Sequence, residues 1–282
     1  MTSKQLLLTR EPILAALQAA LEPLDYVYAM WEGGAAASGR LDEWSDIDVQ
    51  FDVDDARVAD TFAVVERALE TLSPIDLKYQ TPQLPWQGIS QWFYRLKNAS
   101  QYLLLDVAVI QHSAPDKLLT SEIHGQAVFY FDKANVSRVA PLDWGDLNAR
   151  LRNRIASLRV TFEMYQILTL KELNRGNALE ALAFYSGYTL RPLVEVLRMR
   201  YDPTRYNFHT RYVYYNLPAD VVRKLESLFF VANGDDIRAK RAQAEAWFYE
   251  TLEQIQLAQP LDIEGNSAYR YPRRQTNKII RE

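Results

Sequence analysis

The sequence predicts an α+β protein: a mixed β-sheet with flanking helices, followed by a helical bundle. Residues 1–140 alternate between the period-2 pattern of strands and the 3.6-residue pattern of helices. From residue 141 to about 260 only helical patterns occur. Pro141 and the Asp143-Trp144-Gly145-Asp146 segment mark a junction. We therefore expect a first domain over 1–140 and a second over 141–282, with a polar, basic tail from about residue 260.

The first half begins with a helix and two strands. Residues 11–21 carry apolar side chains at helical spacing, with Thr9 as a candidate N-cap. Residues 25–31 predict a first strand and 47–53 a second. The second strand places its apolar residues on one face and its polar residues on the other, so we expect one face against helices and one on a polar cleft or solvent.

The rest of the first half continues with one helix and three strands. An amphipathic pattern predicts a helix over 55–72, and residues 75–79 predict a short strand. Residues 91–96 and 102–110 predict a hairpin. The second arm is apolar on both faces, which is typical of a central strand.

The second half is expected to be a helical bundle. Residues 147–173 predict one helix or two, which end with Gly176 as C-cap. An amphipathic helix is predicted over 178–200, with a kink at Pro192. Residues 201–218 are loop-like. Two further helices are expected, at 218–231 and 236–257.

Composition narrows the possible classes of protein. Hydrophobic residues make up 48% of the 282-residue chain, which supports a packed core and not disorder. No cysteine is present, so disulfides and thiolate metal sites are excluded. The apolar run near the N-terminus is too short for a signal peptide, and no window has the length of a membrane span. We expect a cytoplasmic protein without membrane contact.

Charge is divided unevenly along the chain. Residues 1–140 contain 11 basic and 19 acidic residues, whereas residues 141–282 contain 21 and 17. An acidic half beside a basic half can bracket a metal–triphosphate, although ordinary solvated surfaces explain the division equally well. The acidic overall charge gives no nucleic-acid footprint beyond the basic residues of the tail, so we do not expect a nucleic-acid partner.

A small-residue turn precedes a strand that begins with Asp46 and Asp48. The turn contains three glycines: Gly33, Gly34 and Gly39. Glycine has no Cβ and permits positive φ, so such a turn can bring backbone N–H groups close to phosphate oxygens. The two carboxylates share one face of the strand and repel each other, and sites that keep both charged usually bind a cation. Oxygen ligands with substrate phosphates favour Mg²⁺, which indicates a nucleotide site.

This pattern resembles the nucleotidyltransferase superfamily of the DNA polymerase β type. The motif of that superfamily is Gly-Ser, a helical turn, a second Gly, and then Ser-Asp-hydrophobic-Asp. In this sequence the corresponding residues are Gly34-Ala35, Gly39 and Ser45-Asp46-Ile47-Asp48. Ala35 replaces the family's serine, which removes one phosphate donor but leaves the backbone N–H groups. The resemblance implies that the nucleotide contacts this turn and its neighbours: Gly33, Gly34, Ala35, Gly39, Arg40 and Ser45.

Asp106 is the single charged residue in the apolar strand over 102–110. Burial of an ionised Asp is costly unless it is compensated. A metal shared with Asp46 and Asp48 would compensate it; a Lys or Arg partner at a strand end is the alternative. The family has its third carboxylate on such a strand. The resemblance therefore implies Asp46, Asp48 and Asp106 as catalytic residues and ligands of two Mg²⁺ ions.

The order of the domains is similar to that of antibiotic nucleotidyltransferases of the kanamycin, streptomycin and lincosamide types. In some relatives the third carboxylate is the general base, and in others a Glu of the helical domain is; Glu163 and Glu172 are the candidates here, with surface or ion-paired roles as the alternative. Lys171 and Arg175 share a helical face and can reach the β- and γ-phosphates, unless that face is simply solvated.

Other residues have structural explanations at hand. We expect Arg191 and Arg198 to pair with Glu195 on the same helix. Trp31 and Trp44 can stack on a base or belong to the core. The three histidines have no metal-ligand spacing: His112, His124 and His209.

The resemblance implies Mg²⁺-dependent transfer of a nucleoside monophosphate to a hydroxyl group of a small molecule, with release of pyrophosphate. AMP from ATP is the expected group, and another nucleoside triphosphate can replace ATP. The acceptor can be an antibiotic-like compound, although the positive second half argues against a strongly cationic aminoglycoside. We expect a monomer or a homodimer.

Two alternatives remain open. The chain can be a weak or inactive nucleotide-binding or regulatory module, which Ala35 favours and the three retained carboxylates oppose. It can also be a protein-modifying AMP-transferase, although the chain is longer than the minimal version of such enzymes.

Overall fold

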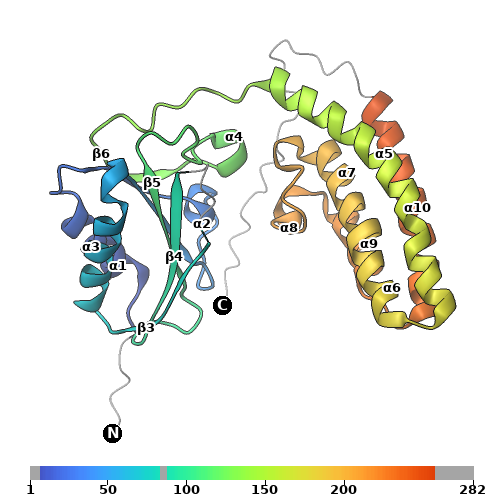
Figure 1. The fold of residues 1–282 in the computed structure, drawn as a ribbon, viewed down its shortest axis with the longest axis horizontal. Coiled ribbons are helices and arrows are strands. Elements are labelled where there is room, and N and C mark those ends of the chain that lie inside the picture. The colour runs from blue at the N-terminus through green and yellow to red at the C-terminus, as the bar shows by residue number, and fades with distance from the viewer. Residues whose placement is uncertain (1–6, 83–87, 258–282) are drawn as a thin grey trace, which may run out of the picture. The chain divides into compact units, whose positions relative to one another are not determined.

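The computed structural model describes residues 7–82 and 88–257. The chain divides into two compact units, Met1–Leu142 and Asp143–Glu282 (Figure 1). The predicted tail from about residue 260 lies outside the described residues. Together, a mixed sheet with flanking helices and a helical second unit confirm the α+β fold class.

The first unit is built on a six-stranded sheet with the order β3-β4-β5-β2-β1-β6. Within it, β2 and β5 are parallel and the other neighbours are antiparallel. The strands are β1 Val27–Glu32, β2 Ile47–Val53, β3 Ile75–Gln80, β4 Ile89–Leu96, β5 Leu105–Gln111 and β6 Val128–Asp132. The helices are α1 Arg10–Leu21, α2 Gly34–Ala37, α3 Val58–Glu70 and α4 Ser121–His124, with a 3-10 turn at Asp55–Arg57.

The main core lies between one face of this sheet and helices α1 and α3, which lie side by side on it (Figure 1). The apolar face that the sequence predicts for β2 is fully buried here: Ile47, Val49, Phe51 and Val53. Helix α1 contributes the four residues whose spacing predicted it: Ile13, Leu14, Leu17 and Leu21. Burial of these side chains leaves the polar residues of β2 and β5 on the opposite face.

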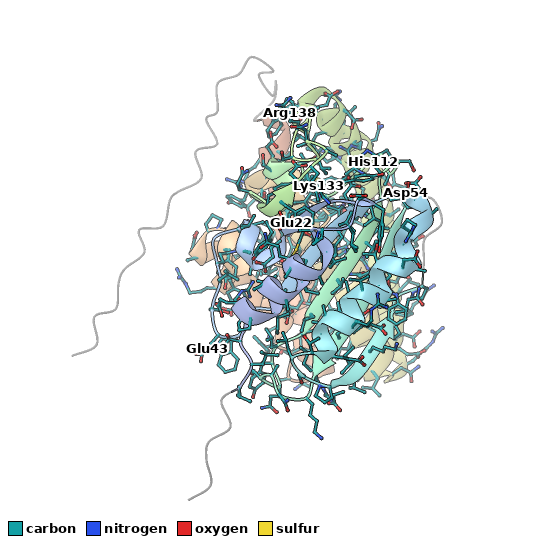
Figure 2. All side chains as sticks on the ribbon, turned by 90° about the vertical axis from the view of Figure 1, so that its left-hand side faces the viewer. Glu22, Glu43, Asp54, His112, Lys133 and Arg138 are labelled. Carbon is teal, nitrogen blue, oxygen red and sulfur yellow. The ribbon has the colours of Figure 1, made fainter. Side chains whose placement is uncertain are left out.

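Part of the opposite face is buried, and the prediction that this face opens onto a polar cleft or solvent is wrong there. Asp52 is fully buried, and its carboxylate contacts His112 Nδ1 at 2.8 Å and Lys117 Nζ at 3.2 Å. Trp31 is 1% exposed in a second apolar cluster on this face, so it is a core residue. Figure 2 shows His112 at one end of the sheet and Glu43 at the other.

Two features of the first unit were not predicted. Strand β6 pairs with β1 although we expected no strand there, and its signal is the run of β-favouring residues at 128–131. Strand β5 begins at Leu105 and not at residue 102, so the connection from β4 is longer than a tight hairpin turn. The predicted central position of β5 is confirmed, since it lies between β4 and β2.

The second unit is helical, as predicted. The first helix is a single one, α5 Trp144–Arg175, and the others are α6 Ala178–Phe184, α7 Arg191–Tyr201, α8 Val213–Asn216, α9 Ala219–Phe229 and α10 Gly234–Leu257. Asp143 caps α5 by accepting a hydrogen bond from the Asp146 N–H at 3.0 Å, and Gly176 ends it with φ of 79°. None of the described helices has the length and apolarity that a membrane crossing requires.

The helix predicted over 178–200 is interrupted by a π-helical segment, Tyr185–Leu190, just before Pro192. Proline lacks an N–H group and crowds the preceding turn, which accounts for the wider turn at this point. Gln166 of α5 stabilises the segment: its Nε2 donates to the Tyr188 carbonyl at 3.0 Å, and its Oε1 accepts from Thr189 at 2.8 Å. Leu179, an apolar residue of the predicted amphipathic helix, is 85% exposed.

The predicted pairing of Glu195 with Arg191 and Arg198 is wrong. Glu195 instead accepts two hydrogen bonds from Arg154 of α5, at 2.6 and 2.8 Å. Arg198 is fully buried and pairs with Asp202. It also donates to the main-chain carbonyls of residues 209 and 211. The Arg154–Glu195 pair therefore connects α5 with α7, and Arg198 connects α7 with the main chain at residues 209 and 211.

We predict that Arg198→Met destabilises the protein by about 3–5 kcal/mol, because the buried Asp202 loses one of its two arginine partners and the carbonyls of residues 209 and 211 lose a buried donor. Urea unfolding of the full chain, followed by circular dichroism, measures this. The matched control is Arg223→Met on the exposed side of α9, which should change stability by less than about 0.5 kcal/mol. Equal stability of the two variants would contradict the assigned role of Arg198.

Candidate functional site

Asp48 and Asp106 lie directly beside each other in the sheet. They are register partners of the parallel pair β2 and β5, so their side chains project from the same face. Neighbouring strands are about 4.8 Å apart, which places the two carboxylates close together. Both residues are half-buried. The fold thus joins two acidic residues that are distant in the sequence.

Gln91 of β4 holds Asp106 from the other side. Its Nε2 lies 2.6 and 2.8 Å from the two carboxylate oxygens. In the β4–β5 register Gln91 lies opposite Ala108, which is two residues from Asp106 on the same face of the sheet. Gln91 lies in the predicted strand over 91–96, and only the strand register identifies its contact with Asp106. A carboxylate fixed by an amide keeps one orientation, which suits a ligand or catalytic group.

The glycine turn packs directly on Asp48. The Gly33 N–H donates to the Asp48 carbonyl at 2.9 Å. Gly34 has φ of +53°, and a Cβ at this position would lie 1.7 Å from Asp48 Oδ2. No side chain fits there. Glycine is thus required both by the backbone conformation and by the close approach of a carboxylate.

The turn continues as the short helix α2, at the place where the motif of the resembled family has a helical turn. Ser38 Oγ donates to the Gly34 carbonyl at 2.9 Å, and the Arg40 N–H donates to the Ala35 carbonyl at 2.9 Å. Gly39 has φ of +62° with open space around it. Arg40 is half-buried directly after this glycine. Hydrogen bonds within the turn thus hold its backbone. Ala35 contributes only its main-chain carbonyl to them.

Gln50 extends the polar face beyond Asp48. Its side-chain amide lies beside Gly33, 3.2 Å from where a Cβ would stand. Gln50 Oε1 is buried and accepts no hydrogen bond from the described residues. Buried acceptors are normally satisfied. This oxygen can therefore receive a hydroxyl or amino group of a ligand beside the turn.

The loop before β2 is a compact turn around Asp42. Its Oδ1 accepts hydrogen bonds from the Trp44 N–H at 3.0 Å and from Ser45 Oγ at 2.8 Å. The hydroxyl of Ser45 thus closes the turn. Asp46 follows with an exposed side chain, and its carbonyl accepts a hydrogen bond from Arg10 Nη1 at 3.3 Å.

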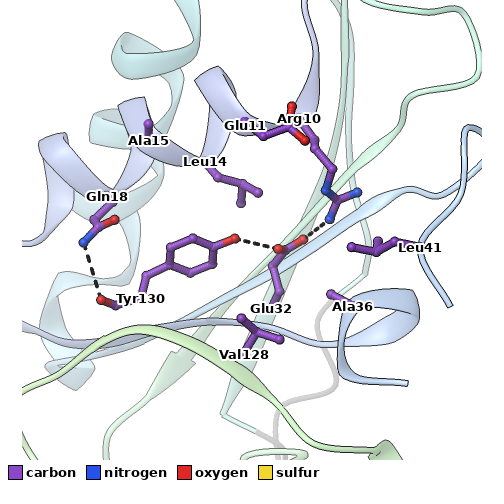
Figure 3. Close-up of a pocket in the computed structure, with 10 residues that line it drawn as sticks. All are labelled: Arg10, Glu11, Leu14, Ala15, Gln18, Glu32, Ala36, Leu41, Val128 and Tyr130. Carbon is purple, nitrogen blue, oxygen red and sulfur yellow. Dashed lines mark hydrogen bonds and ion pairs between the residues drawn. The ribbon is translucent and has the colours of Figure 1, made fainter. Parts of the chain in front are cut away.

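A buried charge network supports the turn from the other side of β1. Glu32, 3% exposed, forms an ion pair with Arg10 of α1 and accepts a hydrogen bond from the Tyr130 hydroxyl at 2.7 Å (Figure 3). Ala36 of α2 lines the same cavity, which measures about 360 Å³. Because Arg10 also binds the Asp46 carbonyl, this network connects α1, β1 and β6 with the start of β2.

The register sets Asp48 and Asp106 side by side, and the role of Asp46 as a third ligand stays a prediction. Within residues 7–82 and 88–257, no three His, Cys, Asp or Glu side chains lie close enough together to hold a metal ion. Asp48 and Asp106 present oxygen ligands side by side. Mg²⁺ is commonly held by one or two carboxylates, with substrate phosphates and water completing its shell. The pair fits such an ion.

The predicted residues of the second unit all lie on α5. Glu163 and Lys171 are exposed. Arg175 forms an ion pair with Glu172, which is buried and also accepts a hydrogen bond from Asn177 Nδ2 at 2.8 Å. The hydrogen bond from Asn177 and the pairing with Arg175 lower the pKa of Glu172. Glu172 therefore stabilises the end of α5, whereas phosphate contacts of Lys171 and Arg175 stay a prediction.

Among solved structures, the chain is similar to an aminoglycoside 6-adenyltransferase from Bacillus subtilis. The sequence identity is 12% and the TM-score 0.34, over 89% of this chain and 91% of the other. No protein-family model and no curated protein sequence matches the chain. The named activity of that structure falls within the class of antibiotic nucleotidyltransferases that the sequence resembles. A similarity of this size assigns no activity.

Two glycines with positive φ allow the contact with Asp48 to be isolated. At Gly34 and Gly39 alike, alanine should cost about 1–2 kcal/mol of backbone strain. Gly34→Ala should cost a further amount of about 1–3 kcal/mol, because its Cβ must displace Asp48. Urea unfolding of both variants measures the difference. In a double-mutant cycle, Asp48→Ala should remove most of this further cost of Gly34→Ala. If the two substitutions are additive instead, the close approach of Gly34 to Asp48 is contradicted.

A second prediction concerns the stability of the buried network at high pH. Burial, together with Glu32, raises the pKa of Tyr130 well above its usual range. The phenol is therefore neutral in the folded state at pH values where the unfolded chain, with a pKa of about 10, ionises. Its contribution to stability is complete below that pH and is lost as the pH rises further. Tyr130 is one of several sources of the wild-type decline, because the pKa is also raised at four other tyrosines: Tyr94, Tyr185, Tyr214 and Tyr249.

Tyr130→Phe should therefore flatten the loss of unfolding free energy between about pH 8 and pH 11. At the lower pH the variant should be less stable by about 1.5–3 kcal/mol, the usual value of a hydrogen bond to a charged group. Tyr79→Phe, at an exposed position of β3, is the control and should leave the profile unchanged. An unaltered slope in Tyr130→Phe would disprove the assignment.

Proposed function

We propose that the chain is a Mg²⁺-dependent nucleotidyltransferase, which moves a nucleoside monophosphate to a hydroxyl group of a small acceptor and releases pyrophosphate. The observation that carries the proposal is the position of Gly34 against Asp48, beside Asp106 on the parallel strand. A glycine turn for phosphates and an oxygen-ligand pair for a cation meet within one short section of the fold. That combination suits a metal–triphosphate.

Each part of the site has a distinct task in this proposal. The backbone of the turn at Gly33, Gly34 and Ala35 binds phosphate oxygens, for which the missing serine hydroxyl is not required. Asp48 and Asp106 hold the cation, with Asp46 as a further ligand from the start of the same strand. A bound Mg²⁺ neutralises the charge on the phosphates as the leaving group departs.

Asp106 has two possible tasks, as cation ligand and as base for the acceptor hydroxyl. Gln91 donates to both of its oxygens and so fixes the direction in which the carboxylate faces. A fixed carboxylate beside the cation can orient the acceptor hydroxyl and receive its proton. Glu163 remains a candidate base from the second unit. Glu172 is a weaker one, because its carboxylate is already engaged by Arg175 and Asn177.

The substrates follow from the same site. The nucleotide is proposed to be ATP, with AMP as the transferred group, and Lys171 and Arg175 are proposed to bind its terminal phosphates. The acceptor is a small hydroxyl-bearing molecule, and an antibiotic-like compound is one class to test. If nucleotide binds tightly and no acceptor reacts, the alternative of a nucleotide-binding regulatory module is favoured.

The test is pyrophosphate release from ATP and Mg²⁺ with a panel of hydroxyl-bearing acceptors. Asp48→Asn and Asp106→Asn should each reduce the rate at least about a hundredfold, because metal stabilisation is worth several kcal/mol and each 1.36 kcal/mol is tenfold in rate. The matched control is Asp60→Asn on the exposed side of α3, which should keep the wild-type rate. Full activity of Asp48→Asn would refute the site assignment.

A further inference from the structure

An exposed aromatic pair lies at the edge of the candidate site. Trp44 and Tyr102 have ring centroids 4.9 Å apart and an interplanar angle of 74°. Their exposed fractions are 59% and 54%. In an edge-to-face pair, each ring keeps at least one face that its partner does not cover. The pair therefore offers an open aromatic surface to a planar ligand.

The sheet places this surface next to the carboxylates. Trp44 precedes β2 and Tyr102 precedes β5, the two strands that carry Asp48 and Asp106. The Ile47 N–H donates to the Leu104 carbonyl at 2.9 Å, so the two segments before the strands lie side by side. Two residues span at most about 7 Å, which limits the distance from the main chain of Trp44 to that of Asp46.

Trp44 is held in place on the protein side. The Asp42 carboxylate accepts a hydrogen bond from its N–H, and Ser45 closes the same turn from the other end. Trp44 is thus presented on a structured turn although its ring is largely in water. Tyrosine and tryptophan that expose so much apolar surface in a fixed position are typical of binding surfaces.

The chemistry of the ligand follows from the reaction. This step rests on the proposed function, which requires a nucleotide and a hydroxyl-bearing acceptor. Of these two substrates, the nucleotide always carries a planar aromatic ring. Its ribose separates the base from the phosphates, so a base-binding surface is expected beside the phosphate and cation site and not within it.

We propose that Trp44 and Tyr102 form the stacking surface for the base of the nucleoside triphosphate. Every base has a π-face, so stacking gives affinity without selecting one base. The site should accordingly accept several nucleoside triphosphates with similar affinity. Selection of ATP, where it occurs, must come from hydrogen bonds elsewhere.

The experiment compares a ligand that has a base with one that lacks it. Titration calorimetry of the full chain in Mg²⁺ measures the binding of α,β-methylene ATP and of inorganic tripolyphosphate. Trp44→Ala should weaken binding of the ATP analogue about tenfold and leave tripolyphosphate affinity unchanged, because stacking on one aromatic ring commonly contributes such a factor. Trp44→Phe should retain most of the affinity, and Tyr102→Ala should weaken it less than Trp44→Ala.

Trp144→Ala is the matched control, since Trp144 is also exposed but begins α5 in the second unit. It should bind both ligands like the wild type. Circular dichroism establishes whether each variant is folded. If Trp44→Ala does not fold, Tyr102→Ala serves as the test.

The outcomes separate the two proposals. If the wild type binds the ATP analogue and Trp44→Ala binds it equally well, the stacking surface is refuted while the proposed function stands. If Trp44→Ala weakens the binding of both ligands equally, the stacking surface is also refuted, because the substitution then acts on the phosphate site. A change confined to the KM of an acceptor assigns the surface to the acceptor instead. If the wild type binds neither ligand, the proposed function fails and the stacking surface fails with it.

Discussion

The contact between Gly34 and the Asp48 carboxylate is the constraint on which the rest of the site depends. A Cβ at Gly34 would lie 1.7 Å from Asp48 Oδ2, so the turn can reach the carboxylate only as glycine. The hydrogen bond from Gly33 to the Asp48 carbonyl fixes the same approach at the main chain. Backbone N–H groups of the turn and the Asp48 carboxylate are thereby kept at one spacing. In the proposed site, a phosphate bound to the turn therefore lies near a cation bound to Asp48.

The sheet supplies the second half of this arrangement. The parallel pairing of β2 with β5 sets Asp106 beside Asp48, and the opposite faces of the same strands form the apolar core under α1 and α3. A shift of one residue in this register would turn the carboxylates into the core. Burial of the apolar face therefore enforces the position of the acidic pair. The buried Glu32, paired with Arg10, adds a link from the core helices to the start of β2.

Much of this could be predicted from the sequence, because local patterns determine it. The period-2 alternation of β2, the apolar run around Asp106 and the glycine spacing each report a local requirement. Contacts between distant residues could not be predicted: the pairing of Gln91 with Asp106 depends on strand register, and Glu195 pairs with Arg154 across helices. Asp52 looked like another cleft residue, but His112 and Lys117 bury it. The sequence alone also cannot show whether the Asp46 carboxylate joins those of Asp48 and Asp106, because this depends on the direction of its side chain.

The central claim is that Asp48 and Asp106 together hold the cation that accompanies the nucleotide phosphates. Anomalous diffraction from crystals grown with Mn²⁺ and α,β-methylene ATP tests it most directly. The account predicts a manganese peak within coordinating distance of both carboxylates, with the phosphates on the turn at Gly33 and Gly34. A peak that contacts neither carboxylate, with the nucleotide bound elsewhere on the chain, would contradict it.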